Sequence, residues 1–127
     1  MSRSTAQRRR AFLSGRRAEA LCAWLLRLKG YRILERGFRP ARAHGMGEVD
    51  IVARRGRTIV FVEVKARESH AAAAFAVGRG QQERIARAAR HFLKTRPIYE
   101  AWAMRFDVMA LEAGRFWPVH LKDAWRA

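Results

Sequence analysis

Residues that crosslink or interrupt a chain are scarce in this sequence. It has a single cysteine, Cys22, and only three prolines among 127 residues. One cysteine cannot form an intramolecular disulfide or a cysteine-rich zinc site, so a reducing compartment such as the cytoplasm is expected. No apolar run approaches the ~18 residues that a membrane-spanning helix needs, so no membrane association is expected. Apolar residues still make up 50% of the chain, which predicts one globular domain rather than a disordered protein.

Acidic residues are also few. Aspartate and glutamate number 11 against 27 lysines and arginines, a formal net charge of +16. Because such an excess of one sign repels itself, a polyanion is the expected partner, and nucleic acid is the common one. All but four of the basic residues are arginines, which a bias in codon usage would also produce. Arginine forks onto phosphate oxygens in either case. The candidate phosphate contacts are Arg16, Arg17, Arg67, Arg84 and Arg87.

The first 13 residues, MSRSTAQRRRAFL, contain no acidic residue and no long apolar stretch. They are predicted to form a flexible basic arm that touches phosphates, with the folded domain over 14–127. A mitochondrial transit peptide is the alternative for an arginine- and serine-rich start. The basic excess continues through the whole chain, however, and this favours the arm.

Hydrophobic periodicity and turn residues predict seven elements. In chain order they are a helix over 15–29 that begins after Ser14, strands over 31–35, 48–53 and 58–66, a helix over 81–94, and strands over 101–111 and 115–121. The segment 67–80 has four consecutive alanines and no clear period, so it is expected to be a surface loop. The order αβββαββ indicates an α/β domain.

The second and third strands are expected to form a hairpin that turns at Gly56 and Arg57, with glycine first as in a type II′ turn. Counting outward from this turn places Asp50 directly opposite Glu63. Side chains alternate along a strand, so Lys65 shares the face of Glu63. Both carboxylates lie within otherwise apolar strands, where an unpaired charge is costly.

Two adjacent carboxylates repel each other unless a cation lies between them, and Mg²⁺ or Mn²⁺ is the expected cation. Asp50 and Glu63 are the candidate ligands, and Glu19 at the flank of the first helix is a third. The alternatives are ordinary structural roles. Glu63 and Lys65 would then form a salt bridge where the strand ends, and Glu19 would favour the helix start through the macrodipole.

Three segments carry a family resemblance: GRRAEALCAWLLRLKGYRIL, GEVDIVARRGRTIVFVEVKAR and RFDVMAL. Together they resemble the bacterial YraN family, which is similar to the PD-(D/E)XK nucleases and to archaeal Holliday junction resolvases. The resemblance spans Gly15 to Leu111. It implies a restriction-endonuclease-like single domain, with a central mixed β-sheet flanked by helices, and metal-dependent hydrolysis of phosphodiesters. It favours DNA over RNA as the substrate, with branched or otherwise structured DNA as one candidate and RNA as the alternative.

By motif position, the resemblance implies a catalytic set of Glu19, Asp50, Glu63 and Lys65. The carbonyl of Val64 is a further candidate metal ligand, and Gln81 is a candidate to hold the attacking water. Two positions depart from the family. Gln81 stands where a lysine is frequent, and Gly37 where an asparagine is frequent. Neither departure removes a candidate ligand.

Two other functions are compatible with the charge. One is a nucleic-acid-binding protein that has the nuclease fold without catalysis, and the other is a ribonucleoprotein or assembly factor. A homodimer would suit a four-way junction, although no segment predicts an interface. The four histidines have no zinc-site spacing, and the four tryptophans are expected mainly in packing, with base stacking as the alternative.

Overall fold

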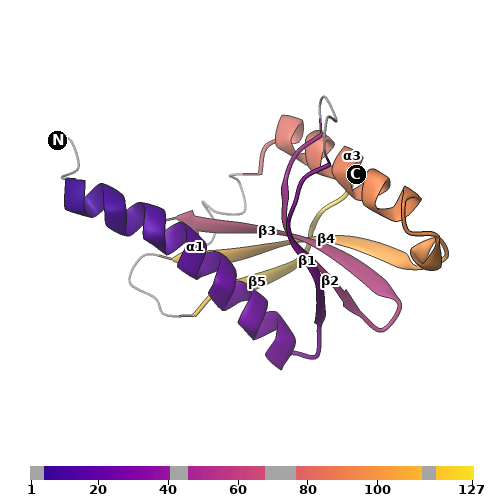
Figure 1. Cartoon of the computed structure of the whole chain (residues 1–127), viewed down its shortest axis with the longest axis horizontal. Coiled ribbons are helices and arrows are strands. Elements are labelled where there is room, and N and C mark those ends of the chain that lie inside the picture. The colour runs from indigo at the N-terminus through magenta and orange to yellow at the C-terminus, as the bar shows by residue number, and fades with distance from the viewer. Residues whose placement is uncertain (1–4, 41–45, 68–76, 113–116) are drawn as a thin grey trace.

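A five-stranded mixed sheet carries one helix on each face (Figure 1). The computed structural model describes residues 5–40, 46–67, 77–112 and 117–127. The elements are α1 (Thr5–Leu28), β1 (Arg32–Phe38), β2 (Val49–Arg55), β3 (Thr58–Arg67), α3 (Arg79–Lys94), the 3-10 turn η1 (Pro97–Tyr99), β4 (Ala103–Glu112) and β5 (Val119–Trp125). The predicted element order and the α/β fold class are confirmed.

The strands follow one another across the sheet in chain order, from β1 to β5. Every neighbouring pair is antiparallel except β3 and β4, which are parallel. A parallel pair needs a crossover connection, and α3 lies within the segment that joins these two strands. As a result, the N-terminus of α3 lies near the carboxyl end of β3, where Glu63 and Lys65 are found.

Both faces of the sheet are buried, which explains the continuous apolar run at the start of β3. Val60 and Val62 pack under α1 in one core, beside Cys22 and Leu26. Phe61, between them in sequence, points to the opposite face and packs in the core under α3. Because side chains alternate, Glu63 and Lys65 belong to the α3 face.

The first helix begins earlier than predicted. It starts at Thr5 rather than after Ser14, so residues 5–13 of the predicted basic arm are helical. Alanine, glutamine, leucine and arginine are good helix formers, and Gly15 alone costs only about 1 kcal/mol in a helix interior. No described helix contains an apolar stretch of the length and hydropathy that crossing a bilayer requires.

Other boundaries also differ from the predicted ones, most of them by a few residues. β1 extends to Phe38 because its backbone pairs with β2 as far as Val49, and β5 extends to Trp125, which pairs with Phe106. The helix α3 starts at Arg79, so the predicted loop is shorter than expected. Residues 68–76 of that loop lie outside the described residues. Pairing with a neighbouring strand, rather than local propensity, sets the ends of these strands.

Candidate functional site

The hairpin of β2 and β3 brings Asp50 and Glu63 together. Gly56 turns the chain with a φ of 58°, and the pairing runs from the turn to Ile51 opposite Val62. One further step along this register places Asp50 opposite Glu63. The predicted hairpin register is therefore confirmed. The register explains why these two charged side chains, 13 residues apart, converge on one face.

Glu63 is almost completely buried, with 8% of its surface exposed. Its Oε1 lies 3.4 Å from Nζ of Lys65 and accepts a hydrogen bond from Nε2 of Gln81 at 3.3 Å. Its Oε2 is buried and has no hydrogen-bond partner among the residues that the structure describes. One oxygen of the carboxylate is thus held by the protein, while the other lacks the partner that a buried acceptor normally has.

Burial, together with the negative charge of Asp50, raises the pKa of Glu63 to about 8. Lys65 acts in the opposite direction but does not compensate. At neutral pH a carboxylic acid in this environment keeps its proton unless a cation takes the proton's place. The electrostatics therefore favour either a protonated Glu63 or a bound cation.

Asp50 is oriented by the strand that carries Glu63. The backbone N–H of Val64 donates to Oδ2 of Asp50 at 2.8 Å. The N–H of Val64 thus binds Asp50, and the carbonyl of Val64 stays a predicted metal ligand. This hydrogen bond holds the Asp50 carboxylate beside Glu63 despite their repulsion.

The loop before β2 lies directly against α3. The N–H of Gly47 donates to the carbonyl of Arg84 at 3.0 Å, and a Cβ on Gly47 would lie 3.2 Å from Cβ of Arg84. Glycine permits this close approach of backbone to helix. The contact ties the start of β2, and hence Asp50, to the helix that carries Gln81. The sequence did not predict this contact, although Gly47, three residues before Asp50, was a signal.

Glu19, the predicted third carboxylate, lies at the edge of this site. Its Oε1 is 3.4 Å from Nε of Arg36, and burial followed by the charge of Asp50 raises its pKa. No three His, Cys, Asp or Glu side chains in the described ranges form a group that could hold a metal. The structure thus pairs Asp50 with Glu63 and leaves Glu19, bound to Arg36, outside the pair.

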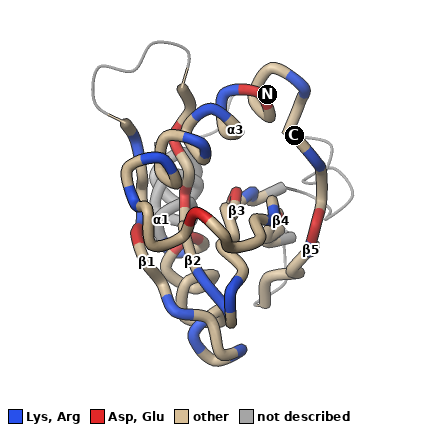
Figure 2. Tube along the Cα trace, turned by 90° about the vertical axis from the view of Figure 1, so that its right-hand side faces the viewer, with Lys and Arg blue, Asp and Glu red and all other residues tan. Residues whose placement is uncertain are grey.

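The predicted phosphate contacts Arg17, Arg84 and Arg87 have exposed side chains. Those of Arg16 and Arg67 lie outside the described part of the structure. Figure 2 shows basic positions on both helices and on the strands, with few acidic ones among them. The basic positions are therefore spread over several elements rather than confined to one.

A second buried carboxylate, Asp107 of β4, was not singled out from the sequence. It is completely buried and faces α1, opposite to Glu63. Arg105 donates to both of its oxygens at 2.8 Å, and Nε2 of His120 lies 2.6 Å from Oδ2. The N–H of Asp123 donates to Oδ1 at 2.9 Å. An Asp inside an apolar strand was the available signal, the same one that identified Asp50.

This network connects three parts of the chain. Nζ of Lys29, at the end of α1, lies 2.6 Å from Nδ1 of His120, and Arg105 donates to the hydroxyl of Tyr31 at 2.7 Å. Burial by itself raises the pKa of Asp107, but hydrogen bonds from His120 and Arg105 outweigh it, and the pKa lies below its usual range. With every acceptor partnered, Asp107 has the properties of a structural residue that joins β5 to β4.

We expect Asp50→Asn to fold and, in a chelator at pH 8, to gain about 1–2 kcal/mol in free energy of unfolding. Asparagine Oδ1 still accepts from the N–H of Val64, while the charge that raises the pKa of Glu63 is removed. A carboxyl whose pKa is raised on folding destabilises the native state as pH rises from its ordinary value towards about 8. The variant should therefore lose less stability than wild type over that range.

Thermal unfolding in chelator from pH 5 to pH 9 measures this difference. The exposed Asp123→Asn is the matched control, because its carboxylate lies on β5, away from Glu63. Unfolding of Asp50→Asn in chelator would show instead that the Asp50 charge holds the core together.

Comparison with known proteins places these residues in a family. Residues 18–111 match the model of the uncharacterised protein family UPF0102. A UPF0102 protein of Parvibaculum lavamentivorans is 49% identical over 91% of this chain and 84% of its own. UPF0102 proteins of Paramagnetospirillum magneticum and Mesorhizobium japonicum are 46% and 45% identical, over 88% and 97% of this chain and 86% and 94% of theirs. Asp50, Glu63, Lys65 and Asp107 all lie within the matched segment.

Proposed function

We propose that this chain, which belongs to the uncharacterised protein family UPF0102 (YraN), is a metal-dependent hydrolase of phosphodiester bonds in nucleic acid. Within that class we propose an endonuclease that acts on DNA, including branched or otherwise structured DNA. We also propose a cytoplasmic location, because the one cysteine of the chain, Cys22, is a free thiol and is buried.

One observation carries the proposal: two carboxylates meet on the α3 face, the buried Glu63 and the half-buried Asp50. In the described part of the chain no group donates a hydrogen bond to Oε2 of Glu63, and Asp50 lies opposite Glu63 on the neighbouring strand. Mg²⁺ and Mn²⁺ prefer oxygen ligands, and Mg²⁺ is often bound by one or two carboxylates plus waters and substrate phosphates. The residues present fit such an ion, and Asp50 and Glu63 would hold it.

When bound, the ion would polarise the scissile phosphate and lower the pKa of a water molecule. Lys65 places a positive charge within 3.4 Å of Glu63, where it can offset negative charge that develops on the phosphate. Gln81 holds Glu63 through its amide nitrogen, and its amide oxygen can accept a hydrogen bond from the attacking water. The N-terminus of α3, which carries Gln81, adds a dipole that favours the phosphate.

The assay for this activity uses linear, nicked and four-way branched DNA, with single-stranded RNA as a further substrate, in Mg²⁺, Mn²⁺ or chelator. We expect metal-dependent cleavage by the wild type and none by Glu63→Gln, which keeps the shape of the side chain. A protein that binds these substrates and cleaves none would instead be the non-catalytic binding protein, which the net charge of +16 favours as the second candidate.

Binding itself is expected to depend steeply on salt and little on sequence. The excess of arginine meets phosphates, and each contact with a phosphate releases a counterion, so affinity for DNA should fall about 10³-fold or more between 50 and 200 mM salt if six or more contacts form. Affinities for several unrelated duplexes, measured over a salt series in chelator, test this expectation. A strong preference for one sequence, or a flat response to salt, would contradict it.

A further inference from the structure

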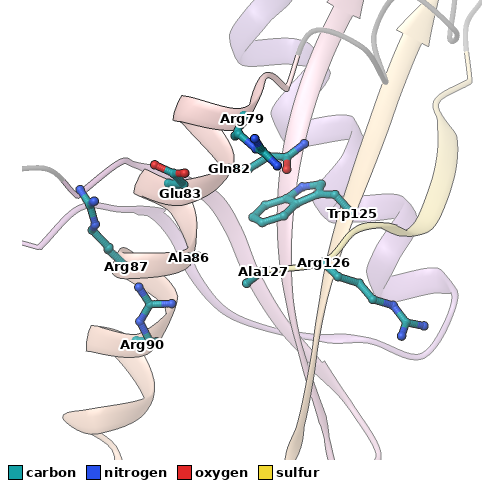
Figure 3. Close-up of a pocket in the computed structure, with 9 residues that line it drawn as sticks. All are labelled: Arg79, Gln82, Glu83, Ala86, Arg87, Arg90, Trp125, Arg126 and Ala127. Carbon is teal, nitrogen blue, oxygen red and sulfur yellow. The ribbon is translucent and has the colours of Figure 1, made fainter.

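A pocket of about 340 Å³ lies between α3 and the end of the described chain (Figure 3). One wall consists of α3 side chains, including Arg79, Gln82 and Arg90, and the other wall is formed by Trp125 and Arg126. The proposed catalytic pair does not line this pocket. Its volume is at the small end of the range for small-molecule sites and is comparable to a single nucleotide.

The charges around the pocket favour an anion. Four arginines line it, Arg79, Arg87, Arg90 and Arg126, and Glu83 is the one acidic side chain that does so among the described residues. Ala127, the last residue of the sequence, lines it as well. Arg79 and Arg90 are eleven residues, or about 16 Å, apart along the helix axis, and their long side chains approach the pocket from its two ends. Guanidinium groups bind phosphate oxygens in two-point contacts. The arrangement suits a ligand that carries phosphate at its ends and a less polar group in the middle.

Trp125 supplies the less polar surface. Its ring is stacked on Phe106, with centroids 4.0 Å apart and planes inclined by 20°, so the indole is held in a fixed orientation. Its Nε1 is buried and has no acceptor among the described residues. An indole fixed by stacking is a platform on which a base can stack, and base–aromatic stacking tolerates any base. A base carbonyl or a phosphate oxygen would also provide the missing acceptor.

The sheet register gives the distance between this pocket and the carboxylate pair. Trp125 pairs with Phe106, which pairs with Phe61 of β3, and Glu63 lies two residues beyond Phe61. Two strand spacings and two residues along a strand correspond to about 12 Å. The phosphates of about four nucleotides cover that distance along a duplex. A strand that lies at Glu63 can therefore also reach Trp125.

We propose that this pocket binds one unpaired nucleotide of the nucleic-acid strand, with its base on Trp125 and flanking phosphates on Arg79 and Arg90. This inference rests on the proposed function and specifies its substrate as one that has unpaired nucleotides near the cleaved bond. A base that remains paired in a duplex cannot present its face to Trp125. A free nucleotide has the same chemistry, but only a strand connects the pocket to Glu63.

The test compares a blunt duplex with the same duplex carrying four unpaired thymidines, in chelator at constant salt. We expect wild type to bind the overhang about tenfold more tightly, since one stacked base contributes a factor of about 5 to 150. Arg79→Gln with Arg90→Gln should abolish the preference, and Trp125→Phe, which keeps an aromatic ring, should retain most of it. The control Arg39→Gln with Arg57→Gln removes two exposed arginines away from the pocket and should weaken both substrates equally.

Equal binding of overhang and blunt duplex by the wild type would overturn the inference. A micromolar affinity for thymidine 5′-monophosphate without an overhang preference would also overturn it and assign the pocket to a free nucleotide. Because these measurements are made in chelator, they do not depend on catalysis. A protein that prefers the overhang but never cleaves would keep this inference and refute the proposed function. Cleavage without a preference for the overhang would support the proposed function and refute this inference.

Discussion

Lys65→Ala should lower the rate of metal-dependent cleavage by about 10²-fold or more and should barely change the affinity for nucleic acid. Nζ of Lys65 lies 3.4 Å from Glu63, and its side chain is 14% exposed, so its charge acts within the site rather than on the surface. Loss of one positioned charge at the reacting group lowers the cleavage rate strongly. Loss of one phosphate contact among many lowers the affinity for nucleic acid only slightly.

Metal affinity in this variant is best measured near pH 9. Lys65 lowers the pKa of Glu63, so its removal favours the protonated acid at neutral pH and would weaken metal binding indirectly. In the variant the pKa of Glu63 lies above the wild-type value of about 8, so Mg²⁺ affinity should approach that of wild type only as the pH rises past 9 and Glu63 becomes ionised. Lys94→Ala, at the opposite end of α3, is the matched control. Equal and small effects of both variants on cleavage would show that Lys65 is only one more basic residue.

Asp107→Asn should lower the free energy of unfolding by about 3–5 kcal/mol, which corresponds to a Tm lower by roughly 10–20 °C. Asp107 is completely buried and accepts two hydrogen bonds from Arg105 and one from Asp123. An asparagine leaves the Arg105 charge without its counterion and replaces one acceptor with a donor. Asp123→Asn is the control, because its side chain is exposed and asparagine tolerates the positive φ of 51° at this position.

The pH dependence separates this effect from a general loss of packing. Hydrogen bonds from His120 and Arg105 hold the pKa of Asp107 below its usual range, so its contribution to stability is complete above the ordinary pKa of an aspartate. That contribution is lost as pH falls through the lowered value. Wild type and Asp107→Asn should therefore converge in stability in acid. A difference that stays constant from pH 7 to pH 2 would contradict the role assigned to the Asp107 charge.

The carboxylate pair could be predicted because one short hairpin contains it. A glycine first in a two-residue turn sets the register, and the register then places Asp50 opposite Glu63 without information from elsewhere in the chain. The amphipathic pattern of α3 was equally local, and the buried side chains of that helix, such as Ile85 and Phe92, are those that the helical period predicts. Local geometry was sufficient to predict both the carboxylate pair and the buried face of α3.

Element boundaries were less predictable, since strand ends depend on neighbours. β5 continues to Trp125 because β4 offers hydrogen-bonding partners there, and the ring of Trp125 stacks on Phe106. The early start of α1 at Thr5 reflects helix-forming residues that were interpreted as an arm because they are basic. Charge pattern indicates a partner for such a segment but does not exclude a helix.

By itself, the sequence determined the basic surface, the order of the elements and the meeting of Asp50 with Glu63, because composition, periodicity and one tight turn are local properties. Only the tertiary structure decided which distant groups meet. Lys29 and His120 lie 91 residues apart in the chain and 2.6 Å apart in space. Glu19 is bound to Arg36, and Arg90 lines the same pocket as Trp125, through helix–sheet packing. Such contacts depend on how the layers pack, and no short segment of the chain contains both partners.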